Sequence, residues 1–409
     1  MVSMGITMGM FLAITRKTSP SISKSKDLIK YETMVWSMHV KAKDKCVLLA
    51  AGGTGGHLYS AKGTSEELKR RGYKVILFTD RRIEGLLDNF FVDQTKFILS
   101  ATFSKKNIIY WPYIVIKLLY GLVISIYWIT YYKPSLAVGF GGYPTVPPLL
   151  AAKICGLKII IHEQNSIMGR ANLLLSNFTN GLTKGFKDIY NLPEKVKKKS
   201  CFSGNPIRDE VTNEINPYLA YNGKIFNILV FGGSQGASFF SKLIPRALSK
   251  LPDNYRKKLN IMHQSRTEEI NSVKDLYISI GIKAEVNDFF YDLPKRLRNS
   301  HLVISRSGAS TISELSLLGR PGILIPLPSS IDGDQEYNAK VLDSLNGAIV
   351  YHQSDINEEI LSDKIFDLIS SPSELLKIAN NAKAASKGDG SKNIVDFIEN
   401  LLTGKLVWK

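Results

Sequence analysis

Four glycines and a histidine follow an apolar run near residue 50, and these residue types could bind a phosphate and accept a proton. The stretch CVLLAAGGTGGH places Gly52, Gly53, Gly55 and Gly56 around one threonine and ends at His57. Glycine lets the backbone approach an anion closely, and imidazole, which titrates near neutral pH, can accept a hydroxyl proton. The spacing matches neither the dinucleotide motif nor the phosphate loop that ends in Gly-Lys-Ser or Gly-Lys-Thr. A strand-to-helix turn without a ligand is therefore the alternative interpretation.

Glycine-rich turns of this kind recur later in the chain. VGFGGYPTVP begins at Val138 and VFGGSQGA begins at Val230, and each follows an apolar run and precedes a helical pattern. A helix N-terminus presents unpaired N–H groups and the positive end of its dipole to an anion. Because the arrangement occurs three times, phosphate binding is favoured over three unrelated turns.

Further polar side chains stand at the ends of apolar runs. HEQN, residues 162–165, directly follows KIII, and such a group either binds a hydroxyl-rich ligand or forms a buried hydrogen-bond network. Thr311 with Glu314 fits a helix-capping box, but a carboxylate in the first turn of a helix facing a cleft could also bind ribose hydroxyls. Asp334 and Gln335 begin a helical pattern that belongs either to a site or to a solvated face. These alternatives stay open at this point.

Alternating strand and helix patterns would position these groups. From Lys45 onward the strand-like runs are nearly continuous in Val, Ile and Leu, which is typical of parallel sheets covered by helices on both faces. The pattern restarts near Asn227 after a polar linker, so two doubly wound α/β domains joined near residue 206 are the simplest architecture. Such sheets bind ligands at the carboxyl ends of their strands. We therefore expect a cleft with a glycine-rich loop on each wall.

The composition favours an anionic partner and argues against a disulfide framework. Among 409 residues, 53 are Lys or Arg and 36 are Asp or Glu, so the formal charge is +17. The cysteines Cys46, Cys155 and Cys201 are far apart and odd in number, so neither disulfides nor a zinc site are expected, and a reducing cytoplasm is the default location. Residues 1–44 are basic and poor in acids; they read as a disordered extension, a start placed too early, or a transit peptide.

The most apolar stretch of the chain runs from Asn107 to Thr130. Its length approaches that of a membrane-spanning helix, but Pro112 and Lys117 interrupt it, and a span here would split the first sheet. We expect a core helix with an exposed flank that touches a membrane interface through basic and aromatic side chains, with an ordinary buried helix as the alternative. The side chains of this flank are Lys105, Lys106, Trp111, Tyr113 and Lys117.

Seven motifs together resemble one enzyme family. In chain order they are GGTGGH, GFGGYPTVPPLLAA, HEQNSIMGRAN, GNPIR, FGGSQGA, SRSGASTISE and DQEYNA. They resemble the MurG family, the peptidoglycan N-acetylglucosaminyltransferases, from about Lys45 to the C-terminus. The resemblance implies a GT-B fold with two Rossmann-like domains. It also implies inverting transfer of N-acetylglucosamine from UDP-N-acetylglucosamine to the C4 hydroxyl of the muramic acid of lipid I, giving lipid II without a metal or other cofactor.

The resemblance also assigns site residues and a domain plan. His57 would be the catalytic base, and the acceptor and donor would contact Thr54, Gly55, Gly56, Tyr143, Asn165, Asn172, Arg208, Ser234, Phe290, Ala309, Ser310, Thr311, Glu314, Asp334 and Gln335. Tyr143 would help to hold the lipid pyrophosphate, Phe290 the uracil and Glu314 the ribose. Residues 45–205 would bind the acceptor and face the membrane, 206–385 would bind the UDP-sugar, and 386–409 would form a helix that returns to the first domain.

The implied partners are UDP-N-acetylglucosamine, lipid I and an anionic membrane surface, with no nucleic acid. The implied location is peripheral, at the cytoplasmic face of the bacterial inner membrane. Three departures stand out: Ser60 replaces a proline usual in the family, Asp334 replaces a usual His or Gln, and the N-terminal extension is atypical. Two rival functions remain: a related glycosyltransferase acting on diacylglycerol, and a non-catalytic basic protein that binds a membrane or nucleic acid.

Overall fold

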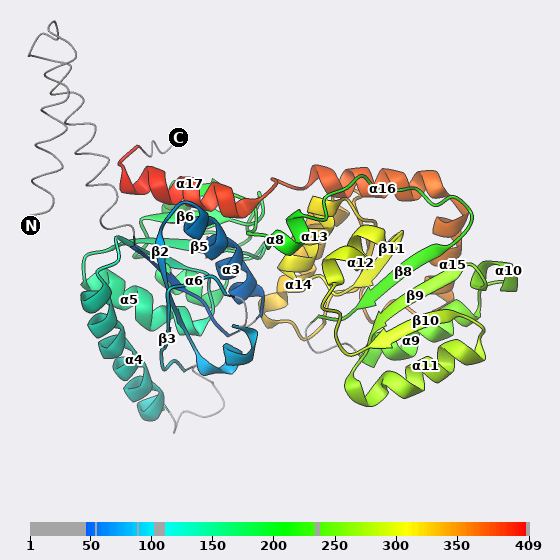
Figure 1. Ribbon diagram of the computed structural model, residues 1–409, viewed down its shortest axis with the longest axis horizontal. Coiled ribbons are helices and arrows are strands. Elements are labelled where there is room, and N and C mark those ends of the chain that lie inside the picture. Colours follow the sequence, from blue (N-terminus) through cyan, green and yellow to red (C-terminus); the bar gives the residue numbers. More distant parts are fainter. Residues whose placement is uncertain (1–45, 54, 88–89, 102–110, 234–237, 406–409) are drawn as a thin grey trace, which may run out of the picture. The chain divides into compact units, whose positions relative to one another are not determined.

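The first of two parallel sheets lies near the N-terminus and has seven strands. The computed structural model describes residues 46–53, 55–87, 90–101, 111–233 and 238–405. The sheet order is β3-β2-β1-β4-β5-β6-β7, and every pairing is parallel (Figure 1). The strands are β1 Cys46–Ala50, β2 Lys74–Thr79, β3 Gln94–Phe97, β4 Leu136–Gly139, β5 Lys158–Glu163, β6 Gly181–Lys184 and β7 Ser200–Phe202.

The second sheet repeats the same topology with six strands. Its order is β10-β9-β8-β11-β12-β13, again with parallel pairing throughout. The strands are β8 Phe226–Phe231, β9 Leu259–Gln264, β10 Lys283–Asn287, β11 Leu302–Ser305, β12 Gly322–Leu324 and β13 Ile349–Val350. In each sheet the strand order reverses beside the first strand, and this reversal is where doubly wound sheets bind ligands. The predicted two-domain GT-B architecture is confirmed.

Helices cover both faces of each sheet, which explains the uninterrupted apolar strands. All five residues of β1 are buried, and its alternate side chains enter two separate apolar clusters, one on each face. The helices of the first half are α3 Gly55–Arg70, α4 Trp111–Tyr132, α5 Val146–Ile154, α6 Arg170–Leu175 and α7 Glu194–Lys197. Short 3₁₀ turns occupy η1 Arg81–Leu86 and η3 Tyr143–Thr145.

The second half is built from crossover helices around two further apolar clusters. Its helices are α8 Asp209–Thr212, α9 Ser238–Ser249, α10 Asp253–Arg256, α11 Ile270–Ser279, α12 Leu293–Asn299, α13 Ala309–Leu318, α14 Asp334–Asp343, α15 Glu358–Ser370 and α16 Pro372–Ala384. The 3₁₀ turns are η4 Thr267–Glu269 and η5 Ile331–Gly333. Helix α13 begins at the cleft end of β11, so its N-terminus is available to a ligand.

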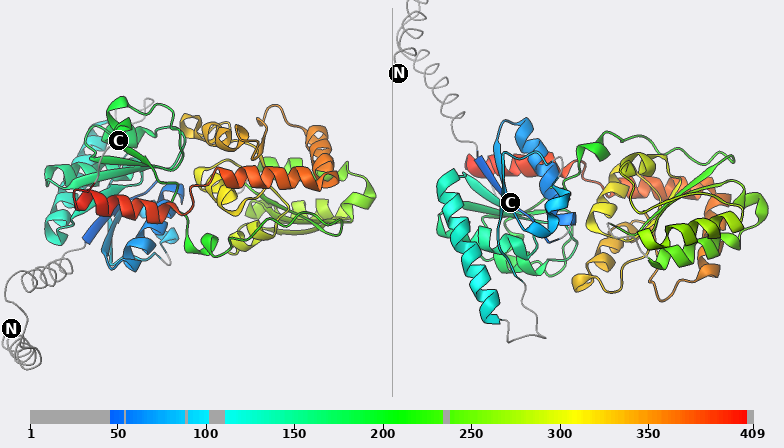
Figure 2. Two further views of the ribbon diagram at one scale, coloured as in Figure 1. Left: turned by 90° about the horizontal axis from the view of Figure 1, so that it is seen from above. Right: turned by 60° about the horizontal axis from the view of Figure 1, so that its bottom comes forward.

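The C-terminal helix packs on the first half of the chain. Helix α17, Gly390–Leu402, buries Ile394, Val395, Phe397 and Ile398 in the same apolar cluster as β1. Figures 1 and 2 show this red helix against the first sheet. Arg71 adds ion pairs to two carboxylates of the helix, one of them Glu399 at 2.9 Å. The residue bounds of the domains remain a prediction.

Helix α4 is more exposed than the sequence suggested. Only Ile114, Gly121, Ser125 and Ile129 of its described side chains are buried, so the expectation of a core helix with one exposed flank was wrong about the extent of burial. Gly121 packs so tightly on the backbone that a Cβ there would collide with the Leu99 carbonyl oxygen. Within the described residues, α4 is the one helix long and apolar enough to cross a membrane. Lys105 and Lys106 lie outside the described residues.

Candidate active site

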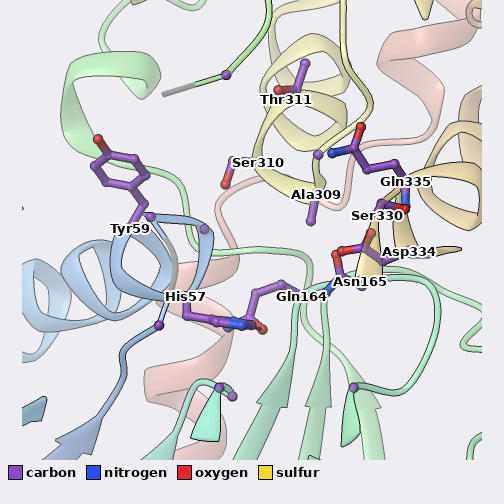
Figure 3. A pocket seen from close by; sticks show the side chains of 18 of the residues that line it. His57, Tyr59, Gln164, Asn165, Ala309, Ser310, Thr311, Ser330, Asp334 and Gln335 are labelled. Carbon is purple, nitrogen blue, oxygen red and sulfur yellow. Dashed lines mark hydrogen bonds between the residues drawn. The ribbon is translucent and has the colours of Figure 1, made fainter. Parts of the chain in front are cut away.

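A cleft of about 1090 Å³ opens at the carboxyl ends of the strands and is lined by residues from both halves of the chain. Two predicted site residues, Thr54 and Ser234, lie outside the described residues. The cleft is lined by every other one: Gly55, Gly56, His57, Tyr143, Asn165, Asn172, Arg208, Phe290, Ala309, Ser310, Thr311, Glu314, Asp334 and Gln335. Residues far apart in sequence, such as His57 and Gln335, therefore meet in one space (Figure 3).

Two glycine-rich loops meet beside His57 because β1 and β4 are neighbouring strands. Gly141 and Gly142 have φ values of 87° and 79°, in the left-handed region that favours glycine. A Cβ on Gly141 would lie 3.1 Å from Cε1 of His57, and one on Gly142 would lie 3.2 Å from Cδ2. The His57 ring therefore rests directly on this turn, and only glycines leave room for it.

Gly142→Ala should disable the site much more severely than a matched glycine substitution elsewhere. A Cβ at Gly142 would collide with the carbonyl oxygen of Gly52 and press on His57. Gly72 has nearly the same φ, 78°, but a Cβ added there would have no other atom within 4 Å. We expect Gly72→Ala to cost about 1 kcal/mol of unfolding free energy, with turnover unchanged. Gly142→Ala should cost several times more or abolish turnover, as thermal unfolding and steady-state kinetics would measure; equal effects would contradict this packing.

The imidazole of His57 lies near the start of α3 and is held by Gln164. Its Nδ1 is 3.4 Å from Gln164 Oε1, and the two side chains lie beside each other in Figure 3. Burial lowers the pKa of His57, and hydrogen bonds to the Gln164 side chain and the Phe140 backbone only partly oppose this effect. A neutral imidazole at pH 7 is the form that can accept a proton. Ser60, at the position of the usual family proline, bonds Gly56 O at 3.2 Å inside α3, so the helix tolerates it.

Different residues of the HEQN segment fit the two interpretations, a buried hydrogen-bond network and a ligand contact. His162 is fully buried between Thr183 Oγ1 and Asn205 Oδ1, each at 3.0 Å, and burial lowers its pKa to about 4. The Glu163 carboxylate accepts from the backbone N–H groups of Asn165 and Gly169. These two residues thus form the structural network, although an edge of Glu163 also lines the cleft. Burial raises the pKa of Glu163.

Asn165, the last residue of that segment, is oriented from the other half of the chain. Asn338 of α14 is fully buried; its Nδ2 donates to Asn165 Oδ1 at 3.0 Å. Its Oδ1 accepts from the backbone N–H of Ser166 at 2.8 Å. Asn165 therefore reaches the cleft with its amide oxygen already bonded, and the HEQN loop is joined directly to the second half.

The opposite wall of the cleft begins with the N-terminus of α13. Gly308 is the N-cap residue and no side chain caps the helix, so the capping box suggested by Thr311 and Glu314 does not form. The Glu314 carboxylate instead pairs with Arg208 Nη2 at 3.1 Å. The Arg208 guanidinium also lies 4.4 Å from the ring centroid of Tyr59. A cation and a helix N-terminus thus stand together in the cleft, as phosphate binding requires.

The loop before α14 brings Asp334 and Gln335 to the same wall. Gln335 Oε1 accepts from Leu327 N at 3.0 Å, which leaves its NH₂ group for the cleft. Asp334 Oδ1 is buried without a hydrogen-bond partner among the described residues, and burial raises the pKa of this carboxyl. Asp332, at φ 59°, pairs with Arg170 across the cleft. An unpartnered acceptor at Asp334 suits a sugar hydroxyl better than a phosphate.

Several cleft residues were not assigned from the sequence. Gln164 lies within the quoted HEQN motif and Tyr59 lies just beyond GGTGGH. Their signal was position alone, since Tyr59 follows His57 by two residues on α3 and Gln164 directly precedes Asn165. Phe290 is in the cleft but only 5% exposed, and Arg296 lies 4.2 Å from its ring centroid. Its neighbours Phe289 and Tyr291 are the exposed aromatics there. Runs of adjacent aromatic residues do not reveal which ring faces a cleft.

Comparisons with known proteins agree with this geometry. The Glycosyltransferase family 28 N-terminal domain matches residues 47–183, and the Glycosyltransferase family 28 C-terminal domain matches residues 227–395. The crystal structure of MurG from Acinetobacter baumannii superposes with a TM-score of 0.72 at 26% identity, covering 87% of this chain and 99% of that chain.

Curated relatives are closer in sequence. A UDP-N-acetylglucosamine–N-acetylmuramyl-(pentapeptide) pyrophosphoryl-undecaprenol N-acetylglucosamine transferase from Sinorhizobium fredii is 43% identical over 367 residues, covering 89% of this chain and 97% of the relative. One of the same name from Agrobacterium fabrum is 42% identical over 363 residues, covering 88% and 96%. The chain therefore belongs to the MurG family of N-acetylglucosamine transferases, within glycosyltransferase family 28.

Proposed function

We infer that the chain transfers N-acetylglucosamine from UDP-N-acetylglucosamine to the C4 hydroxyl of the muramic acid of lipid I, with inversion, and so produces lipid II. The observation that carries this inference is the cleft, in which His57 on one wall and the α13 N-terminus with Arg208 on the other are brought together. One wall offers a base and the other offers groups for a nucleoside diphosphate. Transfer of a sugar from a diphosphate to a hydroxyl needs both the base and the groups that bind the diphosphate.

The donor would lie along the second half of the chain. Arg208 and the backbone N–H groups of Ala309, Ser310 and Thr311 would hold the diphosphate, Glu314 the ribose and Phe290 the uracil. Asn165, Asp334 and Gln335 would surround the sugar. The ion pair between Arg208 and Glu314 supports this assignment, because it holds both side chains in place before the ligand arrives.

Charge develops on UDP as the glycosidic bond breaks. The α13 N-terminus and Arg208 stabilise that charge more strongly in the transition state than in the ground state, which lowers the barrier. On the other side, His57 takes the proton of the acceptor hydroxyl while its oxygen forms the bond to C1. Tyr143 and the adjacent glycines would hold the lipid pyrophosphate. Attack and departure on opposite faces of C1 invert the anomeric centre.

Activity at a membrane requires a surface that meets lipid, and α4 carries the best candidate. The side chains of one face recur at helical spacing and are 55–64% exposed: Ile116, Leu119, Tyr120, Val123 and Tyr127. Lys117 Nζ lies 4.4 Å from the Tyr113 ring centroid on the same helix. Apolar side chains flanked by aromatic and basic groups suit a peripheral contact with an anionic membrane surface. The α4 face would thus hold the enzyme at the cytoplasmic side of the bacterial inner membrane.

Replacing Ile116, Leu119 and Val123 together by serine should weaken binding to vesicles that contain anionic phospholipid by about ten-fold or more. Each apolar side chain contributes on the order of 1 kcal/mol to binding even when it is only partly buried in the membrane. Sedimentation with the vesicles would measure this. The matched control replaces Ile278 and Leu219, which are 73% and 75% exposed outside α4, and should bind as well as the unchanged chain. Equal losses in both variants would contradict a membrane role for α4.

The substrates are tested by transfer of labelled sugar from UDP-N-acetylglucosamine, UDP-glucose and UDP-galactose to a lipid I analogue and to diacylglycerol, with a chelator present. The proposal predicts product from UDP-N-acetylglucosamine and the lipid I analogue alone. Product only on diacylglycerol would assign the chain to a different glycosyl transfer. Product in no combination would contradict the catalytic assignment.

A further inference from the structure

Gln164 contacts the proposed base from inside the protein. The side chain is buried, with 3% exposure, and its Oε1 lies 3.4 Å from Nδ1 of His57. This distance is long for a hydrogen bond, but such contacts in an unliganded site commonly shorten in the substrate complex. The role of Gln164 depends on which end of its amide faces the ring.

The backbone settles the orientation of that amide. Gln164 Nε2 donates to the carbonyl oxygen of Phe140 at 2.7 Å. A carbonyl oxygen can only accept, so the NH₂ group must point to Phe140, and the amide oxygen must point to His57. The reversed orientation would set two oxygen atoms against each other at hydrogen-bonding distance. Gln164 therefore presents an acceptor, not a donor, to the imidazole.

An acceptor at Nδ1 selects one form of the neutral ring. The hydrogen stays on Nδ1, so the lone pair stays on Nε2. We propose that Gln164 is a positioning residue that fixes His57 as the Nδ1–H tautomer and thereby keeps Nε2 free to take the proton of the acceptor hydroxyl. This inference rests on the proposed function. In the step itself, the O–H proton moves to Nε2, the oxygen forms a bond to C1, and the C1–O bond to UDP breaks with its electron pair leaving on the diphosphate.

Gln164 is itself held on its backbone side. Asn205 Nδ2 donates to the Gln164 carbonyl oxygen at 3.0 Å, and the same Nδ2 lies 2.8 Å from Ser313 Oγ on α13. Because Nδ2 is the donor, Asn205 Oδ1 accepts from Nε2 of the buried His162 at 3.0 Å. The amide that faces His57 thus belongs to a network that reaches α13, and a rigid support of this kind is what a positioning residue needs.

The direct test is the tautomer of His57 in the full-length chain labelled with ¹⁵N in its histidine rings. Six histidines contribute signals, and the His57→Ala variant identifies those of His57. Long-range ¹H–¹⁵N spectra distinguish the protonated from the unprotonated ring nitrogen. We expect Nδ1–H in the unchanged chain. In Gln164→Leu the Phe140 backbone is the remaining hydrogen-bond partner of the ring, and the share of the Nε2–H tautomer should rise. The matched control is Gln264→Leu, which should leave the His57 tautomer unchanged. Gln264 is also buried in the cleft and donates to a backbone carbonyl, but it has no contact with His57.

Kinetics give a second readout. Gln164→Leu should lower kcat by about 10- to 10²-fold, with the KM for UDP-N-acetylglucosamine little changed. Gln164→Glu keeps an acceptor toward Nδ1 and adds a charge, although its second oxygen can no longer donate to the Phe140 carbonyl. Its diagnostic effect is therefore on the pH profile, in which the acid limb of kcat should shift to higher pH. Nε2–H in the unchanged chain, or the same tautomer and pH profile in Gln164→Leu, would overturn the proposal. Because the spectra need no substrate, absence of transfer would contradict the proposed function without affecting this test.

Discussion

Alanine in place of His57 should lower kcat by about 10²- to 10⁴-fold, which is the usual contribution of a positioned general base. The affinity for UDP should stay nearly unchanged, because the ring contacts Gln164 and the Gly141–Gly142 turn and not the wall that would hold the nucleotide. Steady-state kinetics with a lipid I analogue and calorimetry with UDP would measure the two quantities. The control is His352→Ala, since His352 is an exposed histidine outside the cleft lining.

The pH dependence follows from the same histidine. Burial lowers the pKa of His57 from its ordinary value of 6.5. The base is active when neutral, so kcat should hold as the pH falls to about 6.5 and decline only below that, as His57 becomes protonated. The acid limb should disappear in His57→Ala. Comparable losses of turnover and UDP affinity in His57→Ala, or an unchanged acid limb, would remove His57 from the role of base.

Arg208→Met should lower kcat/KM for UDP-N-acetylglucosamine by about 10²- to 10³-fold, the scale expected when a group that stabilises developing charge is lost. The side chain is 20% exposed and pairs with Glu314, whose side chain is 10% exposed. Removing the cation would leave a nearly buried carboxylate without its partner, at a cost of about 3–5 kcal/mol. Donor binding and stability should therefore fall together in this variant.

A second pair of variants separates these two effects. Adding Glu314→Gln to Arg208→Met removes the unpaired charge, so it should recover most of the melting temperature but not the donor kinetics. Arg208→Lys keeps the charge without the planar fork and should lie between the unchanged chain and Arg208→Met. Recovery of kcat/KM in the double variant would show that Arg208 acts only through stability and does not bind the donor.

Much of the fold is encoded in short-range patterns. Strands such as β1 and β5 are apolar on both faces because helices cover both sides of the sheet, so uninterrupted runs like CVLLA and KIII predict parallel strands directly. The restart near Asn227 corresponds to β8, the first strand of the second sheet. Patterns of this kind indicate which residues of a segment are buried, and this information was enough to predict two doubly wound sheets.

Burial set by distant contacts was harder to anticipate. The composition of α4 is that of a core helix, yet nothing in its sequence states that, of its described side chains, only Ile114, Gly121, Ser125 and Ile129 are buried. The apparent capping box at Thr311 failed for a similar reason. The chain enters α13 at Gly308, so Thr311 is already inside the helix, and Glu314 is drawn to Arg208 from another segment.

The sequence motifs predicted the residues that line the cleft more completely than the residues that hold those side chains in place. Gly55, His57 and Asn165 stand in glycine-rich or polar turns after strands, and strand order then brings them to one cleft. Gln164 gave no separate signal, because its role depends on a backbone carbonyl of Phe140 that is distant in sequence. Asn338 orients Asn165 across the cleft for the same kind of reason. Contacts between a side chain and a remote backbone atom leave no spacing pattern in the sequence.

The measurement that tests the central claim most directly is the anomeric configuration of the product. UDP-N-acetylglucosamine carries an α linkage, and direct attack by a hydroxyl deprotonated at His57, opposite the departing UDP, predicts a β-(1→4) linkage to the muramic acid. The ¹H coupling constant of the new anomeric proton, measured on the product of the unchanged chain with a lipid I analogue, reports this configuration. A β linkage at C4 is the predicted result. An α linkage, or attachment at another hydroxyl, would contradict a single displacement in this cleft.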